Sequence, residues 1–228
     1  MKTKNRSWLI PACFFAVAVL VNLYGRATGS HLLASMVKPA LLPLLALTSL
    51  ACVGSMEPRI VRFLVTAQLL GCAGDIFLIS DDALPLACGL SCFLAGHIFY
   101  FCIFGARSWK GIRPLAWVGI LAAMAVCVAG LLVGIGVKGV FLVPFAVYGM
   151  ALMFLVFCGL AGVLRKLPDS ATWWIVLCGG ALFAFSDSLI ALQMFNGASV
   201  LLEFLVMLTY LAAQSLLAWG AIRIAKTE

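Results

Sequence analysis

The sequence predicts an all-α fold, a polytopic membrane bundle of about eight transmembrane helices. Hydrophobic residues make up 65% of the 228 residues and charged residues only 10%, whereas soluble domains are near half apolar and a quarter charged. The mean hydropathy is +1.18, and long apolar runs alternate with short polar breaks. Because no soluble fold buries that much apolar surface, we expect the chain to lie within a lipid bilayer.

Eight apolar runs have the length that crossing a bilayer requires. A hydrocarbon core of about 30 Å needs roughly 20 apolar residues in a helix. The connections between the runs are short and polar, which leaves no room for an extramembrane domain and predicts one transmembrane domain over residues 1–228. The expected helices cover residues 8–24, 32–53, 60–79, 84–105, 115–137, 139–164, 171–193 and 200–224.

The charge distribution orients these segments. The net charge is +7, but alternating the connections between two sides places 12 of the 15 basic residues on the side that holds both termini. Cytoplasmic loops are enriched in Lys and Arg, so we expect both termini in the cytoplasm and no nucleic acid as a partner. We interpret the first segment as a retained anchor, because its apolar run is long for a signal peptide and no convincing cleavage site follows it. The basic residues on this side are Lys2, Lys4, Arg6, Arg59, Arg62, Arg107, Lys110, Arg113, Arg165, Lys166, Arg223 and Lys226.

All nine cysteines lie in the apolar segments, and none has CxxC spacing. Membrane helices tolerate Cys as a small hydrophobic residue, so we assign the nine to packing and not to metal or disulfide bonds. A zinc site needs several converging ligands, and the two histidines are His97 in a segment and His31 in a connection. We therefore expect neither a metal nor a cofactor.

Ionisable side chains inside the segments are the candidates for function, because each costs at least about 2.5 kcal/mol at the bilayer centre. Lys38 lies in the second segment, Asp75 in the third, His97 in the fourth and Asp187 in the seventh. Glu203, near the start of the eighth segment, is a further candidate. The fifth segment has no ionisable or amide side chain, so we expect it to face lipid, away from the site.

The two aspartates are expected at matching depths. Asp75 lies about 15 residues into its segment and Asp187 about 16 into its own, and the two segments run in the same direction, so a rise of about 1.5 Å per residue puts both in the outer third of the bilayer. Lys38 and Glu203 fall near that level, and His97 lies deeper. The aspartates are 187 − 75 = 112 residues apart, close to half the chain. This separation is consistent with two four-helix parallel repeats.

Two carboxylates that face each other in a low dielectric cannot both ionise cheaply, so we expect one of them to keep its proton near neutral pH. The pair then supplies an acid and a base, as cleavage of a vinyl ether requires: protonation of the alkene carbon, an oxocarbenium ion and attack by water. The same pair suits a proton-coupled transporter of a lipid or small solute. The sequence contains no GxSxG motif and no Gly-rich phosphate loop, and these residues alone leave enzyme and transporter both open.

Four motifs follow one another along the chain. They are Lys38-Pro39 with Leu41-Leu42-Pro43-Leu44-Leu45, then Gly74-Asp75-Ile76-Phe77-Leu78, then Phe93-Leu94-Ala95-Gly96-His97-Ile98-Phe99-Tyr100, and finally Ala184-Phe185-Ser186-Asp187-Ser188-Leu189. Two further features stand in the later segments, Tyr148 after Pro144 and Tyr210 with Gln214. In order and spacing these residues resemble the YhhN-like lysoplasmalogenase family of eight-helix membrane proteins, over nearly the whole chain.

The resemblance implies that the chain hydrolyses the vinyl ether of lysoplasmalogens. The products would be a fatty aldehyde and a glycerophosphoethanolamine or glycerophosphocholine, and the substrate a single-chain lysophospholipid that enters from the bilayer. The resemblance also implies that Asp75 and Asp187 are catalytic, without assigning which is the acid. We expect a multi-pass protein of a bacterial plasma membrane.

Six polar residues of the segments besides the two aspartates are candidates for substrate binding. We expect Lys38 to hold the substrate phosphate, and Tyr148 and His97 to position or tune the two carboxylates. The full set of candidate substrate-binding residues is Lys38, Tyr148, His97, Ser186, Tyr210 and Glu203.

Overall fold

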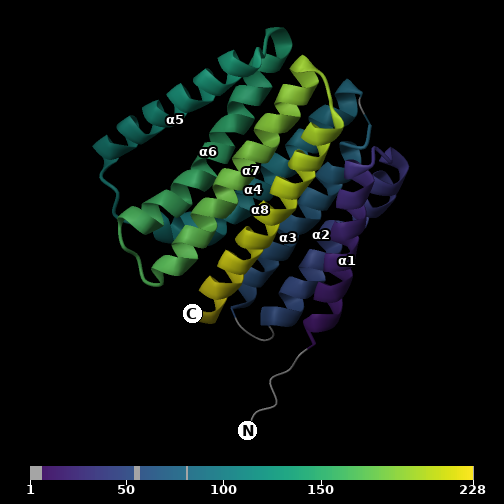
Figure 1. Ribbon diagram of the computed structural model, residues 1–228. Coiled ribbons are helices and arrows are strands. Elements are labelled where there is room, and N and C mark those ends of the chain that lie inside the picture. Colours follow the sequence, from purple (N-terminus) through teal and green to yellow (C-terminus); the bar gives the residue numbers. More distant parts are fainter. Residues whose placement is uncertain (1–6, 54–56, 81, 228) are drawn as a thin grey trace. The chain divides into compact units, whose positions relative to one another are not determined.

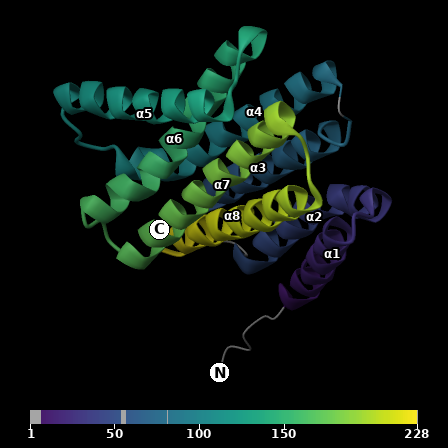
Figure 2. The same cartoon turned by 45° about the horizontal axis from the view of Figure 1, so that its top comes forward.

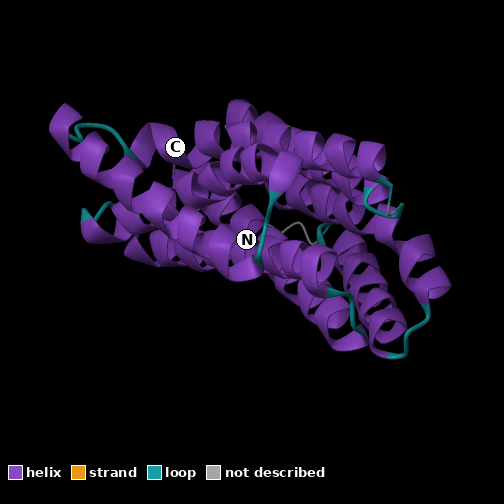
Figure 3. Cartoon of the chain, turned by 90° about the horizontal axis from the view of Figure 1, so that it is seen from above, coloured by secondary structure: helices purple, strands orange, loops and turns teal. Residues whose placement is uncertain are grey.

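The computed structural model describes residues 7–53, 57–80 and 82–227, and in this part of the chain the regular structure is entirely helical (Figures 1 and 3). All eight predicted segments are helices long and apolar enough to cross a membrane, so the chain is an integral multi-pass membrane protein. Lys2, Lys4 and Arg6, on which part of the predicted orientation depends, lie outside the described residues. The helices are α1 (Leu9–Ala27), α2 (His31–Val53), α3 (Pro58–Phe77), α4 (Ala83–Ser108), α5 (Pro114–Ile135), α6 (Leu142–Leu164), α7 (Ser170–Asn196) and α8 (Val200–Thr227).

Proline and glycine account for several of the differences between the predicted and observed helix ends. α3 and α5 begin at Pro58 and Pro114, because the first helical position needs no backbone N–H donor. α5 ends before Gly136, whose φ of 84° gives a left-handed C-cap. The predicted sixth segment is divided, since Gly139 (φ 63°) opens the short 3₁₀ helix η1 (Gly139–Phe141) ahead of α6.

The chain divides into two compact units. Unit 1 comprises residues 1–103 and 218–228, and unit 2 comprises residues 104–217. The boundaries fall inside α4 and α8, so both helices run from one unit into the other without a break. Each unit therefore contains one of the two aspartates that the sequence marks as catalytic candidates, Asp75 in unit 1 and Asp187 in unit 2.

In unit 1, α2 lies between α1 and α3 (Figures 1 and 2). Asn22 of α1 donates a 2.9 Å hydrogen bond to the Ala34 carbonyl of α2. Gln68 of α3 donates to Ser49 Oγ of α2 over 3.2 Å. Polar side chains of this kind hold membrane helices together where the hydrophobic effect cannot.

The α3–α4 contact of unit 1 depends on a glycine next to Asp75. A Cβ atom added to Gly74 would lie 2.8 Å from the Phe93 ring. The aromatic ring of α4 therefore lies directly against the backbone of α3, one residue before the aspartate. This packing fixes the position of the last turn of α3.

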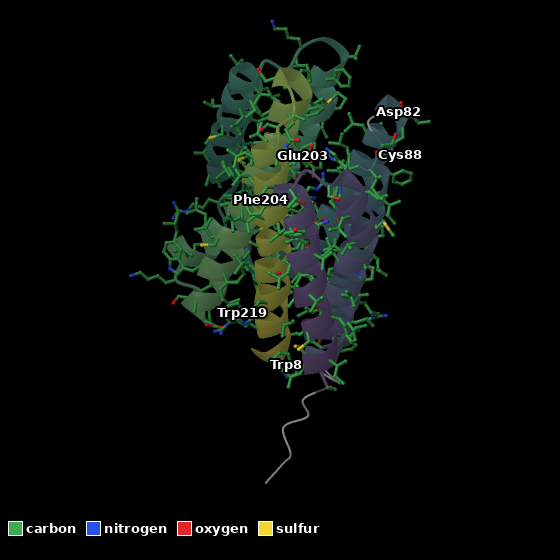
Figure 4. All side chains as sticks on the ribbon, turned by 45° about the vertical axis from the view of Figure 1, so that its right-hand side comes forward. Trp8, Asp82, Cys88, Glu203, Phe204 and Trp219 are labelled. Atoms are coloured by element: carbon green, nitrogen blue, oxygen red, sulfur yellow. The ribbon has the colours of Figure 1, made fainter. Side chains whose placement is uncertain are left out.

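Figure 4 shows how the ends of unit 1 are arranged. Trp8, at the start of α1, lies toward the end opposite Asp82, in the α3–α4 connection, and Cys88, in the first turns of α4. The chain crosses the bundle twice, as α1 and α2, before α3 begins. α3 then crosses it a third time and leads to the α3–α4 connection. This arrangement is the alternation of sides on which the predicted orientation of the chain rests.

In unit 2, the closest helix contact is between α6 and α7. A Cβ atom on Gly159 would lie 2.4 Å from the backbone of Leu177, and one on Gly162 would lie 2.1 Å from the Trp173 ring. Small residues let membrane helices approach this closely. α5 contacts α6 at an angle (Figure 2), and only 17% of its membrane window is buried, as expected of a helix that faces lipid.

Candidate functional site

The polar centre of unit 1 is an ion pair between α2 and α3. Lys38 Nζ lies 3.5 Å from Asp75 Oδ1, and the two side chains are only 7% and 3% exposed. In a low dielectric, removing either partner would leave an uncompensated charge and cost several kcal/mol. Lys38 and Asp75 therefore depend on each other energetically. The sequence did not reveal this pairing between α2 and α3.

Prolines in α2 explain how α3 is held beside this pair. Pro43 has no N–H, so it cannot donate to the carbonyl of Pro39 four residues earlier. Cys72 of α3 donates its thiol to that carbonyl instead, with Sγ 3.3 Å from the oxygen. Because Cys72 lies one turn before Asp75, this bond ties α3 to α2 next to the ion pair. The sequence prediction assigned Cys72 to packing alone, and the Pro39/Pro43 spacing was the signal for its hydrogen bond.

His97 lies in the interior of unit 1 on α4. Its Nδ1 is 2.7 Å from the Phe93 carbonyl oxygen, and because a carbonyl only accepts, Nδ1 carries a proton. The ring also contacts Tyr100 and Phe101, with ring centroids 6.5 and 6.3 Å away. The same Phe93 packs on Gly74, so His97 and the Asp75 turn share one neighbour. A role for His97 in positioning the carboxylates stays a prediction.

The polar centre of unit 2 is a hydrogen bond between α6 and α7. The Tyr148 hydroxyl donates to Asp187 Oδ2. Tyr148 is buried, and Asp187 is half-buried. Tyr148 was expected to position or tune the two carboxylates, and its hydroxyl contacts one of them, Asp187. Its role in catalysis stays a prediction.

Residues near Asp187 in α7 make the contacts between α7 and α8. Ser186 Oγ donates to the Val206 carbonyl over 3.0 Å and is fully buried. Tyr210 packs edge-on against Phe183, with ring centroids 5.6 Å apart, and its hydroxyl accepts from Gln214 Nε2 over 3.4 Å. Both predicted substrate-binding residues therefore have structural contacts within unit 2, and their contact with substrate stays a prediction.

Glu203 lies in the first turn of α8 and is half-buried. Figure 4 shows it beside Phe204 near the start of that helix. An acidic residue in the first turn interacts favourably with the helix dipole, which gives Glu203 a structural role of its own. Its predicted role in substrate binding is untested.

Each unit thus brings one aspartate together with one polar partner, Lys38 with Asp75 and Tyr148 with Asp187. The predicted meeting of the two aspartates involves both units and stays a prediction. Among the described residues, no group of three or more His, Cys, Asp and Glu side chains is placed to hold a metal ion. The chemistry that these residues offer is proton transfer by carboxyl groups.

The family model described as "YhhN family" matches residues 33–221 of the chain. This range contains every candidate residue of both units, from Lys38 in α2 to Tyr210 in α8. No solved structure matches the chain.

Proposed function

The chain belongs to the YhhN family, which is known for lysoplasmalogenases, and on that premise we propose that it hydrolyses the vinyl-ether bond of lysoplasmalogens. The substrate is an alkenyl glycerophosphoethanolamine or glycerophosphocholine, and one water is consumed. The products are a fatty aldehyde and the glycerophospho headgroup. The observation that carries the proposal is that each unit keeps an aspartate inside its membrane-spanning helices, held by a polar side chain of the preceding helix.

The reaction needs one acid and one base. A protonated carboxyl gives its proton to the alkene carbon, and the remaining cation is an oxocarbenium ion. Water attacks this ion while a carboxylate takes the proton from the water. The resulting hemiacetal breaks into the aldehyde and the free glycerol hydroxyl. We propose Asp75 and Asp187 as these two groups, which requires both to reach one substrate.

The ion pair changes how Lys38 is expected to act. Its ammonium lies 3.5 Å from Asp75 and is almost completely buried, so its first role is to hold that carboxylate. Any contact with the substrate phosphate would be shared with Asp75. We therefore propose Lys38 as a positioning residue for the carboxylate as well as a binding residue for the headgroup.

The second candidate function is proton-coupled transport of a lipid or small solute. A buried Lys–Asp pair favours it, because such a pair can gain and lose protons as a membrane pump requires. The two functions differ in one respect that is easily measured. Hydrolysis persists in detergent, whereas transport needs a sealed vesicle and responds to a proton gradient.

The test is aldehyde release from lysoplasmenylethanolamine by the purified protein in detergent. We expect release by the wild type and a loss of roughly 100-fold or more in Asp75→Asn and in Asp187→Asn, since general acid–base catalysis contributes about 10²–10⁴-fold. Asp82→Asn is the matched control, because Asp82 is an exposed aspartate in the α3–α4 connection and should keep full activity.

Two results would overturn the proposal. Full activity of the double variant Asp75→Asn, Asp187→Asn would exclude these carboxylates from the reaction. No release from any enol-ether lysolipid by the wild type would exclude the reaction itself. In that case, uptake into proteoliposomes with and without a proton gradient tests the transporter.

A further inference from the structure

Two basic side chains of unit 1 lie toward the end of the unit that carries the α1–α2 connection. Arg26 is in the last turn of α1, and Lys38 is residue 38 − 31 + 1 = 8 of α2. The predicted alternation of sides makes cations rare here, because the connections on this side hold only Arg26 and Lys138. A basic residue on the side where Lys and Arg are rare calls for a specific reason.

The packing of α1 on α2 brings these two side chains toward each other. Asn22, one turn before Arg26, donates a 2.9 Å hydrogen bond to the Ala34 carbonyl. A Cβ atom on Gly25 would lie 2.9 Å from the Ala34 backbone nitrogen. Lys38 lies one turn, about 6 Å, beyond Ala34. Because helical side chains tilt toward the N-terminus of their helix, Lys38 is directed toward the α1–α2 connection and Arg26 away from it.

The charges around Lys38 do not cancel. Its ammonium is attracted by Asp75, 3.5 Å away, and repelled by Arg26, which is close enough to act on it electrostatically. Two cations and one carboxylate leave one positive charge in excess, and like charges in a low dielectric are unfavourable without a counterion. The exposed Asp82 accepts a 3.0 Å hydrogen bond from Ser80 within its own connection. This end of unit 1 is therefore complementary to an anion.

We propose that Arg26 and Lys38 together bind the phosphate of a single-chain phospholipid, and that Arg26 makes the site specific for a phosphorylated headgroup. Arg26 is half-buried, so its guanidinium is accessible to a headgroup at the membrane surface. A planar guanidinium binds two phosphate oxygens at once. The Lys38 ammonium has three N–H donors and can contact the phosphate while it stays paired with Asp75.

The inference rests on the proposed function for its substrate, and it adds a binding residue and an orientation of the lipid. In a lysoplasmalogen, only the glycerol unit separates the phosphate from the vinyl ether. A phosphate bound between Arg26 and Lys38 therefore keeps the vinyl ether near Asp75, the partner of Lys38. In the predicted orientation of the chain this end faces away from the cytoplasm, so the substrate comes from the outer leaflet.

Equilibrium binding of a lysolipid that cannot react tests the inference without turnover. The probe is an alkyl glycerophosphocholine, in which an ordinary ether replaces the vinyl ether, and the reference is the alkylglycerol with the same chain and no phosphate. We expect Arg26→Gln in detergent to bind the phospholipid roughly tenfold or more weakly than the wild type, as expected for the loss of one charge-assisted hydrogen bond. The affinity for the alkylglycerol should not change.

Two variants serve as controls. Arg26→Lys keeps the charge without the planar fork, so it should keep part of the preference for phosphate. Lys138→Gln removes an exposed basic residue of unit 2 and should bind both lipids as the wild type does. Equal phospholipid affinity in Arg26→Gln and the wild type would overturn the inference, because an arginine that only stabilises the end of α1 would lower thermal stability and leave lipid preference intact. Equal affinity of the wild type for glycerophosphocholine, which has no chain, would overturn the assignment to a lipid.

Arginine modification of the unaltered protein gives the same test if Arg26→Gln does not fold. Phenylglyoxal reacts with guanidinium groups, and mass spectrometry of the peptides locates the modified residues. We expect the alkyl glycerophosphocholine to protect Arg26 and the alkylglycerol to leave it unprotected, while the exposed Arg113 reacts equally in both. Equal modification of Arg26 with and without the phospholipid would contradict the site.

Failure of this inference and failure of the proposed function give different results. A phosphate preference that depends on Arg26, without aldehyde release from lysoplasmenylethanolamine, would support the binding site and exclude the reaction. Aldehyde release by a protein whose phospholipid affinity does not depend on Arg26 would support the reaction and exclude the site.

Discussion

Unit 1 and unit 2 place an aspartate at the same position of corresponding helices but surround it differently. Unit 1 buries Asp75 and pairs it with the Lys38 ammonium, whereas unit 2 leaves Asp187 half-buried and pairs it with the Tyr148 hydroxyl. Two identical carboxyl groups can serve as base and acid when their environments differ in this way. The two aspartates share a helix position and differ in the side chain that contacts them from the preceding helix.

Removal of the two partners should give the largest difference between the units. Lys38→Met leaves the Asp75 carboxylate buried without its ammonium, so we expect a loss of about 3–5 kcal/mol in stability. Tyr148→Phe removes one hydroxyl hydrogen bond and should cost only about 1 kcal/mol. Thermal unfolding in detergent measures both.

The double variant Lys38→Met, Asp75→Asn is the control for this comparison. It removes both charges together, so its stability should lie above that of Lys38→Met. Equal losses of stability in Lys38→Met and Tyr148→Phe would show that the ion pair of unit 1 stabilises the protein no more than the hydroxyl hydrogen bond of unit 2. That result would contradict the expected difference between the units.

Helix packing gives a second, smaller contrast. Gly159→Ala in unit 2 places a methyl group 2.4 Å from the rigid Leu177 backbone, whereas Gly74→Ala in unit 1 meets the Phe93 side chain at 2.8 Å. Overpacking costs about 1–3 kcal/mol, and we expect Gly159→Ala near the upper end because a backbone cannot turn aside. Gly130→Ala on α5 meets nothing within 4 Å and should be neutral in the same unfolding measurement. A larger loss in Gly74→Ala than in Gly159→Ala would reverse the contrast.

The smallest effects are expected from the serines that join neighbouring helices. Ser186→Ala removes the 3.0 Å bond to Val206 in unit 2, and Ser49→Ala removes the acceptor of the 3.2 Å bond from Gln68 in unit 1. Interhelical hydrogen bonds in membranes contribute about 0.6 kcal/mol on average. A loss above about 2 kcal/mol in either variant, which exceeds the range of such bonds, would mean that these serines do more than hold helices together.

The helices and the aspartates inside them could be predicted from the sequence. Long apolar runs dictate membrane helices, and Pro58, Pro114 and Gly136 stand at helix ends for reasons of backbone geometry. The ionisable residues were visible because a charged side chain is costly in an apolar run. The family match over residues 33–221 confirms the resemblance that the ordered motifs indicate.

Which side chains contact the aspartates could not be predicted from the sequence, and the reason is physical. Which side chain of α2 meets Asp75 depends on the rotation of two helices about their axes, and prolines in α2 change that rotation locally. Lys38 was therefore predicted to hold the substrate phosphate, and its ion pair with Asp75 came only from the structure. The Cys72–Pro39 bond had a signal in Pro43, because proline frees the carbonyl four residues earlier.

The most direct measurement is to run the reaction in ¹⁸O-labelled water and analyse the glycerophospho product. Attack of water on an oxocarbenium ion leads to cleavage of the bond between the alkenyl carbon and the glycerol oxygen. We therefore expect the wild type to release an unlabelled glycerophospho product. We expect Asp75→Asn and Asp187→Asn to release no glycerophospho product. Label in that product would mean that the bond on the glycerol side breaks. That result would contradict acid–base hydrolysis of the vinyl ether by these carboxylates.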